Sequence, residues 1–206
     1  MKISGFLIDI SRGNLILMLA MVGLASFILG MGLDSIPCYI TVAILTAPAL
    51  MKIGVSDIAA HLFVIYWGLA SFFTPPVCLA VYVACGISGA GIWETGLNAV
   101  RLGLGAFLIP FAFVFHPSLL LKGSIAQIIM TSLIATSAAV AVGCGSAGYC
   151  LKPLNGLQRS MLIIGAIILI LPRYQTAVIG HILILASLAW QCLQRRQKIR
   201  RERCWQ

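Results

Sequence analysis

Long uncharged stretches dominate the chain and are separated by short polar turns. A bilayer core about 30 Å thick is crossed by about 20 apolar helical residues, and several of these stretches reach that length. Their hydrophobic positions are continuous rather than alternating in short segments, which favours transmembrane helices over a transmembrane barrel. We therefore expect an all-α, polytopic membrane protein. Asp, Glu, Lys and Arg are absent from residues 13–33, 35–51, 58–93, 102–121, 123–151 and 174–194.

Glycine, proline and polar residues mark where the predicted helices begin and end. Asn14 precedes an apolar stretch and is expected to cap its first turn, and Pro48 is expected to kink the second helix. Residues 86–98 are rich in glycine and are expected to form a partly amphipathic connector. The pattern predicts helices over residues 15–29, 38–51, 58–73, 77–85, 102–121, 124–142, 160–171 and 177–193.

Two of the apolar segments contain residues that break a helix. Residues 30–37 hold two glycines, an acid, a hydroxyl and a proline, and residues 58–93 are too long for one crossing and contain Pro75 and Pro76. Consecutive prolines remove two backbone donors and bias the preceding residue away from helical geometry. Non-helical backbone at membrane depth persists only where protein or a water-filled cavity satisfies its polar groups. We therefore expect a binding site, a pore or a gap that another subunit fills.

A pair of interrupted hydrophobic elements is also the sequence pattern typical of a secondary-transporter site. Unwound helix exposes carbonyl oxygens, and hard cations take oxygen ligands, so the hydroxyls of Ser35 and Thr74 are candidate Na⁺ ligands. The alternative for both hydroxyls is a hydrogen bond to a backbone carbonyl, as in other membrane helices. An acid inside an apolar region favours a functional role for Asp34. Its alternative role is to cap the helix that follows.

Composition agrees with insertion in a membrane. Of the 206 residues, 61% are hydrophobic and only 9% are charged, against roughly a quarter in a typical soluble domain. The net charge of +9 is concentrated in the C-terminal tail. A basic cluster directly after an apolar span predicts a cytoplasmic tail near anionic membrane lipid, and disfavours a nucleic-acid partner. The basic residues of this tail are Arg195, Arg196, Lys198, Arg200, Arg201 and Arg203.

Cysteines and histidines form no recognisable chemical motif in the sequence. The seven cysteines include no CxxC pair and no zinc-ligand spacing, so they are expected to pack as small hydrophobic residues. His61, His116 and His181 lie on different predicted spans, with no acid or cysteine at ligand spacing. We expect no catalytic residue and no cofactor, and a membrane-embedded enzyme is the least favoured class.

The two interrupted segments carry a resemblance to a known family. Residues 30–37 read Gly-Met-Gly-Leu-Asp-Ser-Ile-Pro, and residues 74–77 read Thr-Pro-Pro-Val. This pairing resembles the second repeat of the large membrane subunit of TRAP (tripartite ATP-independent periplasmic) transporters. Residues 59–63, 101–104 and 115–121 look like the subfamily in which the small and large subunits are fused. The resemblance extends over residues 13–121, and over 122–193 by layout.

The resemblance implies the second inverted repeat of an elevator-type secondary transporter, with broken helices and a re-entrant hairpin. It divides the chain into a second-repeat portion (1–121) and C-terminal transmembrane helices with the basic tail (122–206). It further implies sodium-coupled import of organic acids such as C4-dicarboxylates across the bacterial inner membrane, with a periplasmic solute-binding protein as partner. Carried over by position, the ion-binding candidates are Gly30, Gly32, Ser35 and Thr74, and the site-shaping candidates are Asp34, Pro37, Pro75 and Pro76.

This chain departs from the family pattern in three respects. Ser35-Ile36 stands where a Thr-Thr or Asp-Thr pairing is commoner. Cys78 stands where the family usually has a glycine after Thr-Pro-Pro-Val. The family also implies a first inverted repeat and small-subunit helices, which we expect as separate partners or as lost parts, because a site at a repeat interface needs both repeats. The two remaining interpretations are a partial permease that works with those partners and a non-transporting membrane remnant or scaffold.

Overall fold

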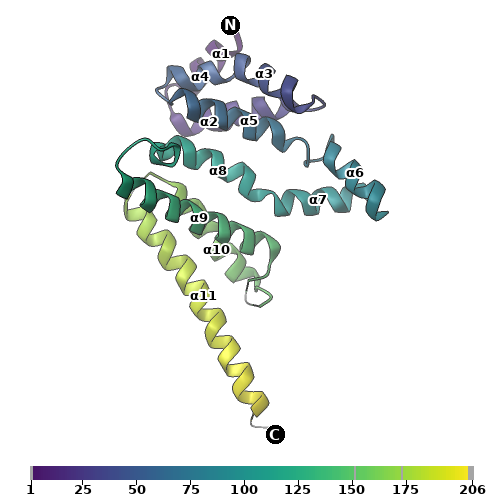
Figure 1. Ribbon diagram of the computed structural model, residues 1–206, viewed down its shortest axis with the longest axis vertical. Helices are drawn as coiled ribbons and strands as arrows, with labels where there is room; N and C mark the ends of the chain where they lie inside the picture. Colours follow the sequence, from purple (N-terminus) through teal and green to yellow (C-terminus); the bar gives the residue numbers. More distant parts are fainter. Residues whose placement is uncertain (1, 151, 173, 204–206) are drawn as a thin grey trace. The chain divides into compact units, whose positions relative to one another are not determined.

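Helices connected by short turns make up the computed structural model, which describes residues 2–150, 152–172 and 174–203, with side chains over 4–150, 152–172 and 175–191. No β-strand occurs in these described residues. The chain divides into two units, residues 1–128 and 129–206. The basic residues of the predicted cytoplasmic tail lie outside the described side chains. Figure 1 labels the helices of both units.

The first unit is arranged around one central helix, α5. This helix packs against α2, α3, α4 and α8 (Figure 1). Asn14 caps α2 as predicted, because its side-chain oxygen accepts hydrogen bonds from the backbone N–H groups of Ile16 (3.0 Å) and Leu17 (3.2 Å). The elements of this unit are α1 (Lys2–Ser11), α2 (Leu15–Gly30), α3 (Ser35–Leu45), α4 (Ala47–Lys52), α5 (Asp57–Ala70), α6 (Leu79–Ser88), α7 (Ile92–Leu102), α8 (Leu104–Phe115) and the 3₁₀ turn η1 (Pro117–Leu120).

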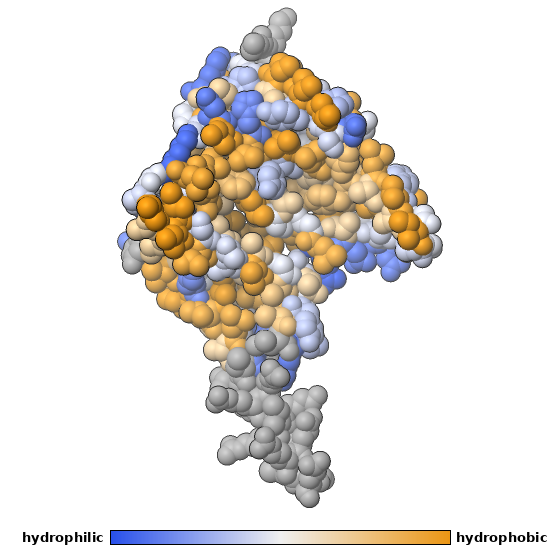
Figure 2. Space-filling model, in the orientation of Figure 1, coloured by the Kyte–Doolittle hydropathy of each residue, from blue (hydrophilic) through white to orange (hydrophobic). Residues whose placement is uncertain are grey.

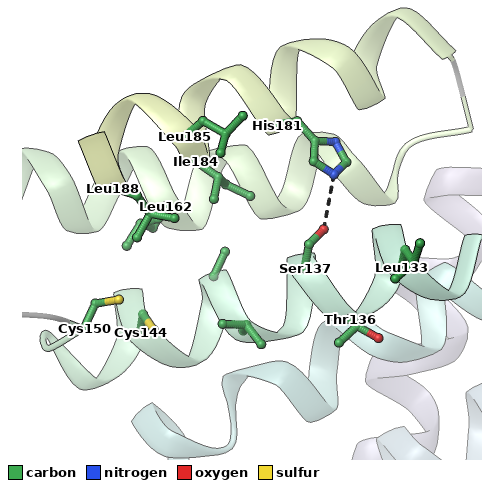
Figure 3. A pocket seen from close by; sticks show the side chains of 12 residues that line it. Leu133, Thr136, Ser137, Cys144, Cys150, Leu162, His181, Ile184, Leu185 and Leu188 are labelled. Carbon is green, nitrogen blue, oxygen red and sulfur yellow. Dashed lines mark hydrogen bonds between the residues drawn. The ribbon is translucent and has the colours of Figure 1, made fainter. Parts of the chain in front are cut away.

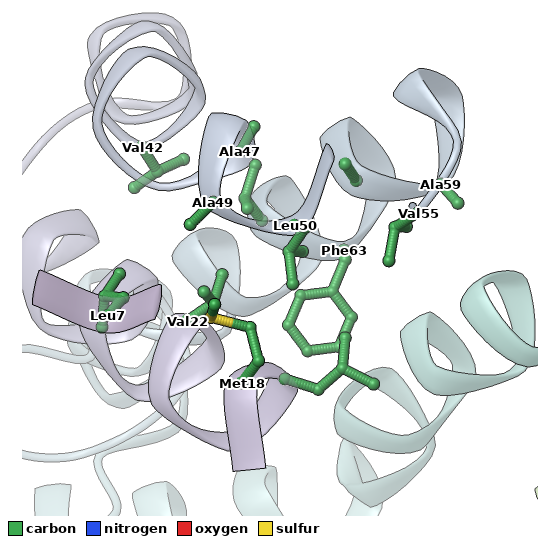
Figure 4. Close-up of a cluster of buried hydrophobic side chains, with 13 residues drawn as sticks. Leu7, Met18, Val22, Val42, Ala47, Ala49, Leu50, Val55, Ala59 and Phe63 are labelled. Carbon is green, nitrogen blue, oxygen red and sulfur yellow. The ribbon is translucent and has the colours of Figure 1, made fainter. Parts of the chain in front are cut away.

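The core of the first unit forms around Phe63 of α5, whose side chain is fully buried. Figure 4 shows its ring facing Met18 and Leu50, which come from α2 and α4. The ring of Phe111 in α8 approaches Phe63 edge-on, with centroids 5.2 Å apart, the arrangement that aromatic pairs prefer. The core therefore joins the first half of the unit to α8.

Long apolar helices confirm the prediction of an all-α, polytopic membrane protein. Among the described residues, Ser35–Lys52, Ile92–Phe115 and Ile125–Ala147 are long and apolar enough to cross a bilayer. Large apolar side chains such as Ile36 and Val83 are also exposed, and Figure 2 shows hydrophobic residues over much of the visible face. Lipid is the solvent that accommodates such a surface.

The break between α3 and α4 comes at Thr46, two residues before Pro48. Thr46 Oγ1 donates a hydrogen bond to the carbonyl of Val42 (2.7 Å). A hydroxyl has one hydrogen, so Ser26 Oγ of α2 is the donor in its 3.0 Å hydrogen bond to Thr46 Oγ1. Pro48 occupies the first turn of α4, where a missing N–H is tolerated. The predicted kink is thus an end of one helix and the start of another.

Other predicted boundaries also differ from the structure: the helix predicted over 102–121 ends at Phe115, and the one predicted over 124–142 continues to Ala147. Helix α3 begins at Ser35 rather than at residue 38, because Pro37 lies in the first turn, where no intrahelical donor is required. Residues 86–98 are mostly helical rather than a connector, since α6 continues to Ser88 and α7 begins at Ile92. Gly89 ends α6 in the left-handed conformation (φ 70°), which glycine adopts without steric cost.

The second unit contains most of α9 (Ile125–Ala147), together with α10 (Gly156–Ile170) and α11 (Tyr174–Arg203). Helices α10 and α11 pack closely where Gly165 and Gly180 face each other, and a Cβ atom on Gly180 would lie 2.8 Å from the carbonyl oxygen of Gly165. Arg159 of α10 binds the end of α9, because its guanidinium donates to the carbonyls of Gly145 (3.0 Å) and Ser146 (3.1 Å). A cation at the C-terminal end of a helix stabilises its free carbonyls.

Candidate functional site

The first interrupted segment is the turn from α2 to α3. Helix α2 ends at Gly30, and Gly32 takes the left-handed conformation (φ 77°) that reverses the chain. Asp34 then caps α3, since its Oδ1 accepts a hydrogen bond from the backbone N–H of Ser35 (2.7 Å). Asp34, Ser35 and Pro37 are exposed. The capping role that the sequence left open for Asp34 is therefore present in the structure.

The second interrupted segment joins α5 to α6 through non-helical backbone. The Thr74 hydroxyl donates to the carbonyl of Ala70, 2.7 Å away, which is one of the two roles considered for it. The Pro75–Pro76 peptide bond is cis. The chain then returns toward α5, because the backbone N–H of Ala80 donates to the carbonyl of Phe72 (3.0 Å). This hydrogen bond ties the first turn of α6 to the backbone just after α5.

The two interrupted segments meet at the C-terminal ends of α2 and α5. Ser71 Oγ lies 3.1 Å from the carbonyl oxygen of Gly30 and 2.8 Å from that of Gly68. A Cβ atom on Gly30 would lie only 2.5 Å from the carbonyl oxygen of Gly68 and 3.0 Å from Cys38 Sγ. Gly30 is therefore required for close contact between these helices. The meeting point places several carbonyl and hydroxyl oxygens together, the ligand type that hard cations prefer.

Two further glycines leave space for side chains of the break. A Cβ atom on Gly96 in α7 would lie 2.8 Å from Cγ of Pro75, and one on Gly103 would lie 2.6 Å from Cε2 of Phe73. Each glycine leaves the space that a ring of the broken segment occupies. The break therefore contacts the end of α2 through Ser71. It contacts α7 and the α7–α8 junction through Pro75 and Phe73.

The predicted site residues take different positions around this meeting point. Gly30 is buried at its centre, and Thr74 follows Ser71 by three residues in the non-helical backbone after α5. Gly32, Asp34, Ser35 and Pro37 form the exposed turn beside it, while Pro75 packs on Gly96 and Pro76 is exposed. Their role in ion binding stays a prediction.

Sequence reasoning missed the residues through which the two segments touch. Ser71, Gly68 and Cys38 were unmarked because their importance depends on tertiary contact. One feature of the sequence pointed to Ser71: it is a polar residue three positions before Thr74 in an apolar stretch. Because the two hydroxyls are so close in the sequence, a second hydroxyl near the break was foreseeable.

Cys78 has a backbone conformation that favours glycine. Its φ is 29° and its ψ is 54°, in the left-handed region that costs an L-residue roughly 1–2 kcal/mol. Its side chain is buried, with 1% of its surface exposed. The glycine usual in the TRAP pattern at this position suits that backbone, and here a small thiol occupies it instead.

Replacing Gly96 with alanine is expected to weaken the packing of Pro75 against α7. Inserting a methyl group against a rigid ring costs about 1–3 kcal/mol, and the better helix propensity of alanine offsets up to about 1 kcal/mol. We expect a net loss of about 1 kcal/mol in the free energy of unfolding, measured by thermal unfolding in detergent. Gly86→Ala is the matched control, because no atom lies within 4 Å of its added Cβ. Equal stability of the two variants would contradict the packing of Pro75 on α7.

A separate cavity of about 400 Å³ lies in the second unit, lined by residues of α9, α10 and α11 and by Cys150. Figure 3 shows mostly apolar side chains, with His181 and Ser137 at one end. His181 Nδ1 lies 2.8 Å from the carbonyl of Ala177, so this nitrogen carries the hydrogen, and Nε2 lies 3.4 Å from Ser137 Oγ. Volume and lining suit an apolar ligand. The cavity contains none of the predicted ion-site residues.

Comparison with known proteins identifies the first unit. The family model described as tripartite ATP-independent periplasmic transporter, DctM component, matches residues 1–128. No curated protein and no solved structure matches the chain. The matched range covers both interrupted segments and their meeting point. The chain therefore belongs to the DctM family, the membrane permease component of TRAP transporters.

Proposed function

We propose that this chain acts as a permease component in sodium-coupled import of organic acids. The observation that carries the proposal is the contact between Gly30 and Ser71, which joins the two interrupted segments at the ends of α2 and α5. Discontinuous helices in secondary transporters leave carbonyls and helix ends free to bind the coupling ion and the substrate. In this chain the same two segments supply the oxygen atoms.

The proposed ion ligands are oxygens that already lie near one another or on the adjoining turn. The Gly30 carbonyl belongs to the contact itself, and Thr74 follows Ser71 by three residues. Gly32 and Ser35 belong to the exposed turn beside Gly30. The Thr74 hydroxyl can keep donating its hydrogen to the carbonyl of Ala70 while a lone pair of its oxygen binds Na⁺. Asp34, Pro37, Pro75 and Pro76 would hold the two turns in shape.

Family membership supports the remaining parts of the proposal. TRAP permeases work with a periplasmic solute-binding protein and a small membrane subunit, and we propose both as partners of this chain. A first inverted repeat is the third partner, because the substrate site of such transporters forms between repeats. The proposed location is the bacterial inner membrane, with the basic tail on the cytoplasmic side beside anionic lipid.

Valine at Thr74 tests the ion site, since it keeps the shape of threonine and removes the hydroxyl. Losing one oxygen ligand of the ion is expected to cost about as much as losing a hydrogen bond to a charged group, about 1.5–3 kcal/mol, so the sodium concentration for half-maximal uptake should rise about tenfold or more. The measurement is uptake of a labelled C4-dicarboxylate into liposomes that contain the chain with all three partners. Thr136→Val is the matched control, because Thr136 also donates to the carbonyl four residues earlier (2.8 Å) and lies in α9, outside both interrupted segments.

The outcomes separate the proposal from its alternatives. Unchanged sodium dependence in Thr74→Val, with normal uptake, would remove Thr74 from the ion site. Uptake that never depends on sodium would refute sodium coupling. If no uptake occurs with any partner supplied, the chain is a non-transporting scaffold or remnant and the proposed function is wrong.

A further inference from the structure

A tight turn after α9 brings two cysteines together in the second unit. Helix α9 ends at Ala147, and Gly148 takes the left-handed conformation (φ 76°) while its N–H donates to the carbonyl of Cys144 (2.9 Å). This is the common way in which a glycine ends a helix and redirects the chain. The backbone N–H of Leu154 then donates to the carbonyl of Gly148 (2.8 Å), which closes a small loop. Cys150 lies within that loop.

The loop places the Cys150 thiol against the Cys144 thiol. The two side chains lie beside each other and line the same cavity, as Figure 3 shows at the end opposite His181. Both cysteines are partly exposed, whereas Cys38 and Cys78 of the other unit are buried. A sequence spacing of six residues gave no sign of this pairing, because the contact depends on the reversal at Gly148.

We propose that Cys144 and Cys150 form a reversible disulfide and that this pair is a modification site for small disulfide oxidants of the glutathione class. The thiolate of one cysteine attacks one sulfur of oxidised glutathione, which forms a mixed disulfide and releases one reduced glutathione. The second cysteine thiolate attacks the protein sulfur of that mixed disulfide and expels the other glutathione. Both protons of the cysteine thiols end on the two glutathione molecules, and the two cysteines are oxidised as one glutathione disulfide is reduced.

Proximity favours the second step over accumulation of the mixed disulfide. Two groups joined by a short tether have an effective concentration in the millimolar range or above, and these thiols already lie at the same end of one cavity in the folded chain. A loop this short removes little entropy from the unfolded chain when it is closed. The disulfide therefore adds little stability, which is typical of a pair that responds to redox conditions rather than a structural bridge.

Peptide mapping of the natural full chain tests this site. The chain in detergent is treated with oxidised glutathione, its remaining thiols are blocked with N-ethylmaleimide, and the peptides are analysed by mass spectrometry. Because Pro153 protects the bond after Lys152, the tryptic peptide over residues 123–159 holds Cys144, Cys150 and no other cysteine. We expect this peptide to lose maleimide labelling at both cysteines and to regain it after dithiothreitol.

Two controls make the result specific to the pair. Cys144→Ser should leave Cys150 as a stable glutathione adduct, since the second thiol that resolves it is missing. Cys85 is a partly exposed thiol in the other unit and serves as the internal reference for glutathione reactivity. The natural chain alone decides the question, so the outcome does not depend on folding of the serine variant.

Three results would overturn the proposal. The first is full maleimide labelling of Cys144 and Cys150 after oxidation. The second is separate glutathione adducts on the two cysteines of one peptide, because adjacent thiols would have resolved them. The third is a disulfide from either residue to a different cysteine. None of these outcomes bears on sodium-coupled uptake, which involves residues of the other unit.

Discussion

Alanine at Gly30 is expected to destabilise the protein by about 3 kcal/mol, at the upper end of the cost of adding a methyl group to a packed interior. The new Cβ would lie 2.5 Å from the carbonyl oxygen and 2.9 Å from the Cα of Gly68. Both are backbone atoms, so no side-chain rotation relieves the clash. Helices α2 and α5 would have to separate, and the contact between the two interrupted segments would open.

Thermal unfolding in detergent measures this loss, and Gly105→Ala provides the comparison. Gly105 lies in α8, and no atom is within 4 Å of its added Cβ, so alanine there should gain up to about 1 kcal/mol of helix propensity. The Gly30 variant should also weaken uptake in the reconstituted transporter beyond its effect on folding. A Gly30 variant as stable as natural protein would show that the ends of α2 and α5 are not in this contact.

The sequence predicts the places where helices break better than the way in which the broken ends meet. Pro75 and Pro76 have no backbone N–H, so an interruption after α5 followed from covalent chemistry alone. Helix α2 likewise begins and ends within one residue of its predicted bounds. Asn14 before the helix and the glycines at its C-terminal end are local signals. Local rules of this kind require no knowledge of the rest of the fold.

Local rules were insufficient where tertiary packing decides. No local signal marked Gly96, and only the structure shows that Gly96 and Gly103 receive the rings of Pro75 and Phe73. The connector predicted over residues 86–98 was wrong for a similar reason. Glycine disfavours a helix by only about 1 kcal/mol per residue, which the contacts of α6 with α7 readily exceed.

The same limit applies to the proposed ion site. The motif singled out Ser35 and Thr74, yet the residue that joins the two segments is Ser71. Its hydroxyl donates within a closely packed junction that includes Gly30 and Gly68. Because Gly30 and Gly68 leave no free space between α2 and α5, these two helices are expected to move together. On the proposed ion binding at Thr74, the end of α2 would therefore also be displaced.

Alanine at Phe63 is expected to cost about 3 kcal/mol, at the lower end of the range for deleting a buried aromatic ring. The lower end applies because the unfolded chain in a membrane or micelle remains in an apolar solvent, so little is lost by transfer. The remaining cost comes from the cavity and the lost contacts with Met18, Leu50 and Phe111. These residues come from three helices, which the cavity would leave poorly joined.

Phe6→Ala is the matched control for this prediction, because 63% of the Phe6 surface is exposed and its loss leaves no internal cavity. Thermal unfolding in detergent should show a large decrease for Phe63→Ala and almost none for Phe6→Ala. The decrease should appear with sodium present or absent, since Phe63 holds the scaffold and not the ion. A decrease that appeared only in sodium would contradict this prediction. It would mean that Phe63 stabilises the proposed ion site at the end of α5 rather than the core.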